Sequence, residues 1–363
     1  MQKKLPAWVC ILVFSLNFLV KGKEGKVLEE FIFEKARFKS CHASTIVELA
    51  DGTLLCAWFG GTGEGRKDVG IWLSRKEGGR WSAPVEVANG IQYRRPDGSL
   101  HRYPCWNPVL FQPKGGPVLL FYKCGPSPRS WWGMLMCSKD NGHTWSVPRR
   151  LPEGIIGPVK DKPIQLQDGT ILCGSSMEDR GWRVHFERTS DFGITWERTY
   201  PINDPLVFSA IQPTFLRHGE MKFQALCRTQ QNVIAQTWTE DGGRTWTKLE
   251  ATELPNPNAG IDALTLTDGR HLLVYNHTVR GGKSPCDREM LNVALSFDGK
   301  KWLACLVLEK EKDCEFSYPA VIQTQDGLVH ITYTWKRLRI KHVVLDPKKF
   351  KPRPIVGGRW PAD

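Results

Sequence analysis

The sequence lacks any sustained 3.6-residue apolar period, so amphipathic helices do not account for its hydrophobic residues. It contains no phosphate-binding glycine loop, no metal-ligand spacing of Cys and His, and no Ser-His-Asp order. The net charge is +12, but no run of five Lys or Arg residues occurs. These absences argue against a helical protein and predict no cofactor, no metal and no nucleic-acid partner. A diffuse basic surface instead favours an acidic partner such as a charged glycan.

The sequence also lacks a hydrophobic run long enough to span a bilayer, which needs ~20 residues. The longest apolar run extends only from Trp8 to Val20, with Lys3 and Lys4 before it and Gly22 after it. This arrangement is typical of a cleaved export signal. We therefore expect a signal peptide at 1–22 and a single domain at 23–363. That domain is secreted, periplasmic or lumenal and has no stable membrane insertion; its oligomeric state is left open.

Export would remove Cys10 and leave ten of the eleven cysteines, an even number that permits disulfides in an oxidising compartment. Cys56 and Cys173 occupy the same place in two sequence repeats, as buried small apolar residues do. The pairing of Cys286 with Cys314 is left open.

Turn-forming and aromatic residues are abundant: 34 Gly, 24 Pro and 15 Trp. One motif of the form Ser/Thr-x-Asp-x-Gly-x-Thr-Trp recurs, and its Asp and Gly predict a tight turn with the Trp buried beneath it. A shorter copy and a worn copy without the Asp accompany the full ones. The copies lie at 138–145, 189–196, 239–246, 296–302 and, worn, 74–81. Their spacing of roughly 50 to 64 residues equals one four-stranded propeller blade with its loops.

A second repeat, out of phase with the first, places a two-residue turn between two apolar strands. The six turns are Asp51-Gly52, Gly115-Gly116, Asp168-Gly169, His218-Gly219, Asp268-Gly269 and Asp326-Gly327. Six such hairpins predict six blades. The last blade ends at Val343-Val344-Leu345, and we expect the strand from Val27 to Phe33 to complete it and close the ring. The predicted fold is an all-β, six-bladed β-propeller.

Both repeats resemble the Asp-box (BNR) repeats of the sialidase, or neuraminidase, superfamily, over roughly residues 35–346. The resemblance is specific for the fold and only weakly specific for function, because Asp boxes also occur in lectins.

The inner strand of each blade lines the central channel, so the polar residues that open these strands should form a ring at one mouth. The ring comprises His42, Asn107, Lys162, Gln212, Asp262 and Tyr318. The following antiparallel strands end at the same mouth and add, among others, Arg228, Asn276 and Trp335. Titratable groups of several kinds with aromatic platforms are typical of a sugar site.

Retaining sialidases use three arginines on the substrate carboxylate, a tyrosine nucleophile with a glutamate beside it, and an acid/base aspartate. The resemblance implies that Tyr318, in Phe316-Ser317-Tyr318-Pro319-Ala320, is the nucleophile, the known exception to the two-carboxylate rule for glycosidases. It likewise implies that Arg228 and Arg288 bind the carboxylate, for which the planar guanidinium fork is suited.

The sequence departs from the family pattern in three places. His42 stands where the first arginine is expected, so Lys162 and His42 would have to assist the two remaining arginines. Gln212 stands near the expected glutamate and cannot act as a base. The acid/base falls in the loop at 61–68, where Glu64 is slightly favoured over Asp68, which could instead hold the loop structurally.

We therefore predict an exo-acting, sialidase-like glycoside hydrolase that removes a terminal acidic sugar with retention. The sugar is sialic acid, another 2-keto sugar acid or a uronic acid. A lyase or other sugar enzyme using His42, and a non-catalytic glycan-binding propeller, are the alternatives. A lectin repeats its binding residues from blade to blade, whereas the six ring positions all differ, which favours an enzyme.

Overall fold

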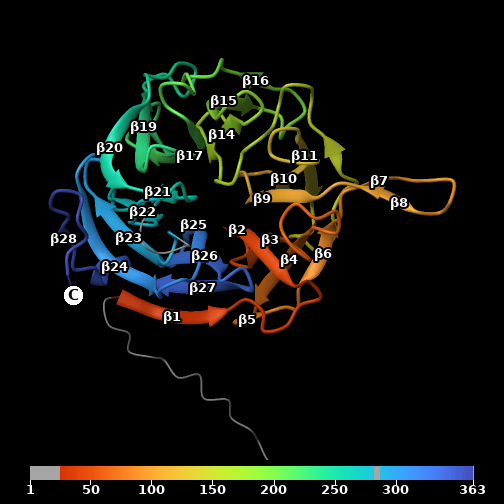
Figure 1. Cartoon of the computed structure of the whole chain (residues 1–363), viewed down its shortest axis with the longest axis horizontal. Coiled ribbons are helices and arrows are strands. Elements are labelled where there is room, and N and C mark those ends of the chain that lie inside the picture. Colours follow the sequence, from red (N-terminus) through yellow and green to blue (C-terminus); the bar gives the residue numbers. More distant parts are fainter. Residues whose placement is uncertain (1–24, 282–286, 363) are drawn as a thin grey trace, which may run out of the picture.

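A computed structural model describes residues 25–281 and 287–362. Six antiparallel sheets are arranged radially around a central axis (Figure 1), and we number them as blades 1 to 6 in chain order. The described residues contain strands and one short 3₁₀ turn, Pro347–Lys349, and none of their helices is long and apolar enough to cross a membrane. The prediction of an all-β, six-bladed propeller is confirmed.

The first three blades follow one another from the inner strand outward. Blade 1 comprises β2 (Ser40–Glu48), β3 (Leu54–Gly61), β4 (Gly70–Glu77) and β5 (Arg80–Trp81), with β6 (Val85–Ala88) also paired to β4. Blade 2 comprises β9 (Cys105–Phe111), β10 (Val118–Cys124), β11 (Trp132–Ser138) and β12 (Arg149–Arg150). Blade 3 comprises β13 (Ile164–Gln165), β14 (Ile171–Met177), β15 (Arg183–Thr189) and β16 (Glu197–Arg198). A hairpin of β7 (Ile91–Arg94) and β8 (Leu100–Arg102) projects from the ring between blades 1 and 2 (Figure 1).

The remaining blades repeat this order. Blade 4 comprises β17 (Ala210–Arg217), β18 (Phe223–Thr229), β19 (Val233–Thr239) and β20 (Glu250–Pro255). Blade 5 comprises β21 (Asp262–Thr265), β22 (His271–Tyr275), β23 (Met290–Ser296), β24 (Trp302–Lys310) and β28 (Arg353–Pro354). Blade 6 comprises β25 (Phe316–Gln323), β26 (Val329–Trp335), β27 (Arg339–Leu345) and, outermost, β1 (Lys26–Phe31).

The ring closes as the sequence predicts, because β1 from the start of the fold pairs with β27 at its end. Their register runs from Lys26 opposite Leu345 to Phe31 opposite Lys341. Closure satisfies the backbone groups that would otherwise remain exposed along the outer edge of β27.

The hydrophobic core is divided into layers between neighbouring blades. One layer joins Leu55 and Ile71 of blade 1 to Leu110 and Leu120 of blade 2, and corresponding layers lie between the other blades. Cys56 and Cys173 lie fully buried, as their repeated position predicts. Cys286 lies outside the described residues, so its pairing with Cys314 stays a prediction.

The Asp-box turns share one hydrogen-bond pattern. In the copy at 239–246, the Thr239 hydroxyl donates to Asp241 Oδ1 (2.7 Å) and accepts from the Gly243 N–H (3.0 Å). The Asp241 carboxylate in turn accepts from the backbone N–H (2.9 Å) and the hydroxyl (2.6 Å) of Thr245. Trp246 then packs flat on Phe186 of blade 3, with ring centroids 3.6 Å apart. This turn therefore stabilises the outer end of a hairpin and helps join it to the preceding blade.

Candidate functional site

Four of the six inner strands have a β-bulge at the mouth of the channel. The pairing register shifts between Ile211 and Thr214 in β17 and between Ser317 and Ala320 in β25, with similar shifts in β2 and β9. A residue with positive φ lies in each bulge: Ala43 (56°), Asn107 (37°), Gln212 (56°) and Tyr318 (53°). In blade 3, Lys160 adopts φ 75° just before the inner strand. Bulges re-aim a side chain out of the strand alternation, and here they define the ring of mouth positions.

Three members of the predicted ring do not occupy these positions. His42 directly precedes the bulge residue Ala43, and Lys162 follows Lys160 by two residues. Asp262 pairs with Val274 after the point at which the equivalent bulge would occur. The prediction assumed that a polar residue before Pro or Ala marks the mouth. In blade 1 the bulge residue is Ala43 instead, and the inner strand pairs of blades 3 and 5 have no register shift.

Lys162 and Asp262 form a structural connection between blades. The Lys162 ammonium donates to both Asp262 carboxylate oxygens (2.9 and 3.0 Å) and to the Ala263 carbonyl (2.9 Å). Asp262 also accepts from the Thr214 hydroxyl (2.7 Å) and the Val321 N–H (2.8 Å). Since these bonds come from blades 3, 4, 5 and 6, neither side chain is free to bind a substrate, contrary to the sequence prediction.

Tyr318 is half-buried at the mouth and contacts Arg228. The Arg228 guanidinium donates Nη1–H to the Tyr318 hydroxyl oxygen and also to Gln212 Oε1 (3.1 Å). Arg228 comes from β18 and is almost fully buried, which lowers the pKa of its guanidinium while leaving it charged. The indole of Trp182 lies over the guanidinium, 5.0 Å from the ring centroid. Arg228 thus presents a fixed positive charge directly beside the phenol.

Arg288 reaches the same place from the segment before β23. Its guanidinium carbon lies 5.8 Å from the Tyr318 ring centroid, compared with 5.5 Å for Arg228. Asn258 connects the two arginines, because its side-chain oxygen accepts from Arg228 Nη2 (2.8 Å) and its backbone carbonyl accepts from Arg288 Nη2 (3.1 Å). The structure therefore brings Tyr318, Arg228 and Arg288 together, as predicted from the sequence.

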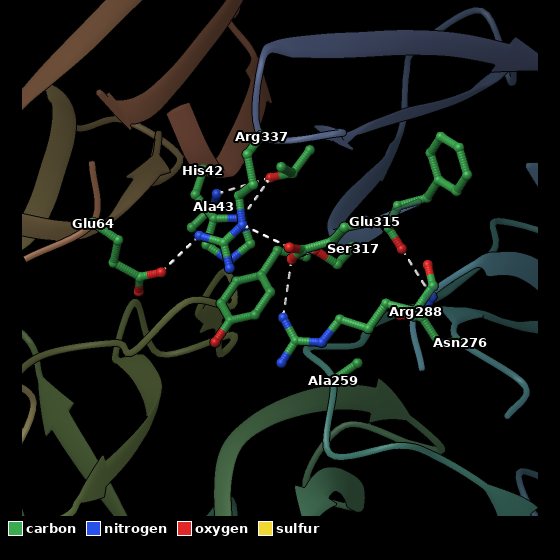
Figure 2. Close-up of polar contacts among 12 residues, drawn as sticks. His42, Ala43, Glu64, Ala259, Asn276, Arg288, Glu315, Ser317 and Arg337 are labelled. Atoms are coloured by element: carbon green, nitrogen blue, oxygen red, sulfur yellow. Dashed lines mark hydrogen bonds and ion pairs between the residues drawn. The ribbon is translucent and has the colours of Figure 1, made fainter. Parts of the chain in front are cut away.

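A third arginine, Arg337, completes the cluster and was not predicted. It lies in the turn between β26 and β27, where its backbone has φ 61°. Glu315 accepts from Arg337 Nε (2.9 Å) and from Arg288 Nη1 (3.1 Å), and Glu64 accepts from Arg337 Nη1 (2.6 Å). Figure 2 shows Arg337 between these two carboxylates. Although burial opposes the charge on Arg337, the two ion pairs raise the pKa of its guanidinium above the usual value.

Glu315 holds Arg288 and Arg337 in place. Burial favours the neutral acid, but Arg337, Arg288 and a hydrogen bond from the Ser317 hydroxyl (2.6 Å) together lower the pKa of Glu315. It is therefore an ionised carboxylate that fixes two cations at the mouth.

His42 is buried beside Tyr318 as a neutral imidazole. The ring centroids lie 4.1 Å apart, and His42 Nδ1 is 2.9 Å from the Thr334 hydroxyl. Burial and the surrounding cations, of which Arg337 has the largest effect, hold the pKa of His42 well below its usual range. A neutral imidazole lacks the positive charge with which an arginine binds a carboxylate, so this geometry favours a role for His42 as a neutral group beside Tyr318.

The remaining predicted residues differ in their surroundings. Asp68 accepts from the Thr62 N–H and hydroxyl (2.8 Å each), so it supports the loop, which was the alternative reading for it. Asn276 is fully buried and donates to the Met290 and Phe316 carbonyls (2.8 Å each).

Trp335 lies away from the mouth, contrary to prediction. Its ring packs edge-on against Phe31 of the outermost strand, with centroids 5.2 Å apart. Thr334, one residue earlier, faces His42 instead, because strand alternation places neighbouring side chains on opposite faces.

Two further residues at the mouth, Lys160 and Glu178, were not predicted from the sequence. Lys160 lies beneath Tyr318 and donates to the Pro319 carbonyl (2.6 Å), the Ile261 carbonyl and Asp161 Oδ1 (2.7 Å). Glu178 follows β14 in the loop whose Trp182 covers Arg228, and burial raises the pKa of its carboxyl. The Lys160 ammonium therefore lies at the floor of the site, and the Glu178 carboxyl lies on its wall.

The missed residues share one property: they lie in loops and turns outside both repeats. Arg337 and Glu315 stand in Trp335-Lys336-Arg337 and Glu315-Phe316-Ser317, beside recognisable elements but in no repeated motif. Glu315 could have been found from the sequence, because it lies three residues before the predicted nucleophile. No comparable sequence signal indicated Asn258 or Glu178.

Comparison with protein-family models identifies the family of the chain. A model of the BNR repeat-like domain matches residues 52–331, which is well over half of the sequence. The chain belongs to this family. A search of curated protein sequences finds no match to this BNR propeller.

Solved structures with the same fold include sialidases. The NanB sialidase from Streptococcus pneumoniae superposes with a TM-score of 0.70 at 12% identity, over 89% of this chain and 71% of that one. The intramolecular trans-sialidase from Ruminococcus gnavus gives 0.71 at 14% identity, over 92% and 100%. A protein of unknown function from Dyadobacter fermentans DSM 18053 gives 0.69 at 18% identity, over 88% and 98%. At these low identities the superpositions show that this BNR propeller shares its fold with these proteins.

The BNR propeller shows no metal centre in the part of the chain that the structure describes, where no group of three or more His, Cys, Asp or Glu side chains is arranged to hold an ion.

Proposed function

We propose that this protein is an exo-acting glycoside hydrolase that removes a terminal acidic sugar with retention of configuration. The observation that supports this proposal is the convergence of Arg228, Arg288 and Arg337 around Tyr318. Guanidinium groups bind carboxylates through paired, charge-assisted hydrogen bonds. A sugar carboxylate bound to them would place its anomeric carbon beside the phenol.

Tyr318 is the proposed nucleophile. A neutral phenol approaches an anomeric carbon that carries a carboxylate with less repulsion than a second carboxylate would. Arg228 donates to the phenolic oxygen and stabilises negative charge on it, while Gln212 only accepts from Arg228 and takes up no proton. The Tyr318 oxygen bonds to the anomeric carbon as the bond to the leaving oxygen breaks, and the phenolic proton passes to water. Water then hydrolyses the glycosyl-enzyme.

Glu64 is the proposed proton donor to the leaving oxygen. In the free protein the Glu64 carboxylate forms an ion pair with Arg337 Nη1 at 2.6 Å. The Glu64 side chain is 43% exposed, so it remains accessible from the mouth. A substrate carboxylate competes for the same N–H, and its binding releases Glu64 from the ion pair. Loss of a cationic partner favours the protonated acid, which is the form that the leaving group requires.

The positive charges at the mouth support an acidic sugar as the substrate class, and an assay identifies which sugar is cleaved. Purified protein is assayed with fluorogenic glycosides of sialic acid, other 2-keto sugar acids and uronic acids, with Tyr318→Phe as the control. Hydrolysis of one acidic class that disappears in the variant supports the proposal. An unsaturated sugar product indicates a lyase, and binding without turnover indicates a glycan-binding propeller. Either result overturns it. Export from the cytoplasm, predicted from residues 1–22, would bring the enzyme to extracellular or lumenal glycans.

A further inference from the structure

Two cysteines face each other across the inner strands of blade 2. Cys105 opens β9 and Cys124 ends β10, and the register places them directly opposite one another. Both are buried as free thiols. Neither thiol takes part in the reaction proposed for the mouth, and neither belongs to a repeated motif.

The backbone shows that this is the closer of the two kinds of antiparallel pair. The Gly125 N–H donates to the Pro104 carbonyl (3.3 Å), which makes the adjacent positions the hydrogen-bonded pair. The Cys105 N–H donates instead to the Val69 carbonyl of blade 1 (3.0 Å). Cys105 and Cys124 therefore form a non-hydrogen-bonded pair, in which the Cα atoms lie about 4.5 Å apart and the side chains approach most closely. Disulfides commonly span Cα separations of 4.4–6.8 Å.

The surroundings hold the thiols against each other. The amide of Gln92 lies 3.5 Å from Cys124 Sγ, and a Cβ atom placed on Gly90 would lie 3.3 Å from Cys105 Sγ. The segment leading into β7 thus covers the pair. A hydrogen bond from Cys105 lowers the pKa of Cys124, and the same contact raises the pKa of Cys105. The Gln92 amide also donates to Cys124 Sγ, and a donor at this position favours the thiolate form of Cys124.

We propose that Cys105 and Cys124 form a disulfide that joins β9 to β10 at the mouth end of blade 2. The oxidant is a small-molecule disulfide such as oxidised glutathione. Cys124 thiolate attacks one sulfur and forms a mixed disulfide, releasing one glutathione. Cys105 thiolate then attacks Cys124 Sγ and releases the second glutathione. The pair loses two electrons and two protons, and the oxidant is reduced to two thiols.

The crosslink would stabilise the wall of the site. Trp106 follows Cys105 and donates its indole N–H to the Gly125 carbonyl (3.0 Å). A Cβ atom on Gly65 would lie 3.3 Å from the Trp106 ring, so the loop that carries Glu64 rests against this indole. Closing the loop between the two cysteines restricts the unfolded chain and fixes the platform beneath the Glu64 loop.

Other cysteines in the described chain provide a matched comparison. Cys41 in β2 and Cys56 in β3 are also buried and lie on neighbouring strands. Cys41 pairs with Gly60, however, and Cys56 pairs with Ile46, so the two are out of register. The same oxidant should leave Cys41 and Cys56 as thiols.

The test is peptide mapping of the protein as purified, and after refolding in a mixture of reduced and oxidised glutathione. Free thiols are alkylated at low pH before digestion with trypsin. Cleavage after Arg102, Lys114, Lys123 and Arg129 yields peptides 103–114 and 124–129, each with one cysteine. We expect these two peptides to be joined, with a mass two hydrogens below their sum. Recovery of both in alkylated form after refolding in the oxidising buffer, or linkage of either to another cysteine, overturns the proposal.

A stability measurement provides a readout that does not depend on digestion. Reduction should lower the Tm of the oxidised wild type by several degrees, and Cys41→Ala should retain this difference. Cys105→Ala and Cys124→Ala should show no difference between oxidising and reducing buffers. Equal Tm values for oxidised and reduced wild type would contradict a disulfide at this site. Neither measurement requires knowledge of the substrate, so failure here leaves the proposed function untouched.

Discussion

The Asp-box turns at the outer ends of the blades and the residues at the mouth of the channel are built on opposite principles. At 189–196 and 239–246 the turns repeat the same hydrogen bonds, residue for residue. At the mouth, the five positive-φ positions carry five different side chains. Arg228 and Arg288 reach Tyr318 from separate elements, and Glu315 connects Arg337 to Arg288. Repetition thus accompanies the fold, whereas departure from repetition marks the proposed chemistry.

The worn Asp box in blade 1 illustrates the first half of this comparison. Ser74 occupies the position of the hydroxyl that the other Asp boxes share, but the Asp of the motif is missing. The buried Ser74 hydroxyl has no hydrogen-bond partner within the described residues. The turn nevertheless forms between β4 and β5. One lost partner is therefore tolerated in a turn because the surrounding blade fixes the backbone.

The largest expected effect is at Tyr318. Tyr318→Phe removes the nucleophilic oxygen but keeps the ring beside His42, so kcat should fall by roughly 100-fold or more while ligand affinity stays within a few-fold. Steady-state kinetics on the substrate found by the glycoside screen measure this. A kcat similar to that of the wild type would remove Tyr318 from the mechanism.

The next effect compares two arginines of one turn region. Arg337→Ala removes a partly buried, charge-assisted contact, typically about 2–5 kcal/mol, so kcat/KM should fall by roughly 30-fold or more. Arg339→Ala, which removes a surface ion pair with Glu34, should change kcat/KM less than about two-fold. Equal losses in the two variants would show that the mouth cluster is incorrectly assigned.

Glu64 should respond in opposite directions in binding and in turnover. Glu64→Gln removes the anion that competes for Arg337, so a non-hydrolysed acidic sugar should bind several-fold more tightly. Turnover should fall because the amide donates no proton to the leaving oxygen. Calorimetric titration and kinetics on the same preparation test both parts. Weaker binding in Glu64→Gln would indicate that Glu64 only supports the structure.

A change at an Asp box should affect stability alone. Asp241→Ala removes several turn hydrogen bonds at a cost of roughly 1–2 kcal/mol, which lowers the Tm by a few degrees and leaves kcat/KM unchanged. Hydrogen bonds to Thr245 outweigh burial and lower the pKa of Asp241 to about 2. Its stabilising effect is therefore present above the unfolded pKa near 3.8 and is lost as the pH falls toward 2. Glu240→Ala, at the exposed neighbouring residue, is the matched control for Tm.

The smallest expected effect is an absence of pH dependence at His42. Because the pKa of buried His42 lies well below 6.5, the ring is neutral between pH 6 and 8. Affinity for an acidic ligand should therefore not weaken around pH 6.5 in the wild type, and His42→Gln should give the same profile. Below pH 6.5 the unfolded state takes up the proton first, so His42 reduces stability as the pH falls. An affinity loss near pH 6.5 that disappears in His42→Gln would contradict this.

Much of the fold could be predicted because short sequence motifs that recur in each blade determine it. The Asp-Gly turns and Asp boxes are each determined within a few residues, and closure by β1 follows from counting strands. Tyr318, Gln212 and Arg228 could be placed by their position relative to those repeats, and Arg288 by the resemblance to the sialidase family. Arg337, Glu315 and Asn258 could not, because their role depends on contacts between loops that are distant in sequence. The ring errors at His42, Lys162 and Asp262 arose because the composition of a strand does not reveal whether it has a bulge or where the bulge lies.

The seam between β1 and β27 has a consequence for how the molecule is made. Synthesis on the ribosome produces β1 first and its partner last, since Phe31 lies opposite Lys341. Until β27 emerges, β1 lacks its hydrogen-bonding partner and the newly made blades remain an open arc. A chain terminated between blades 5 and 6 would keep most of its strands but could not close. Such a product would expose unpaired strand edges, which promote aggregation of incompletely folded chains.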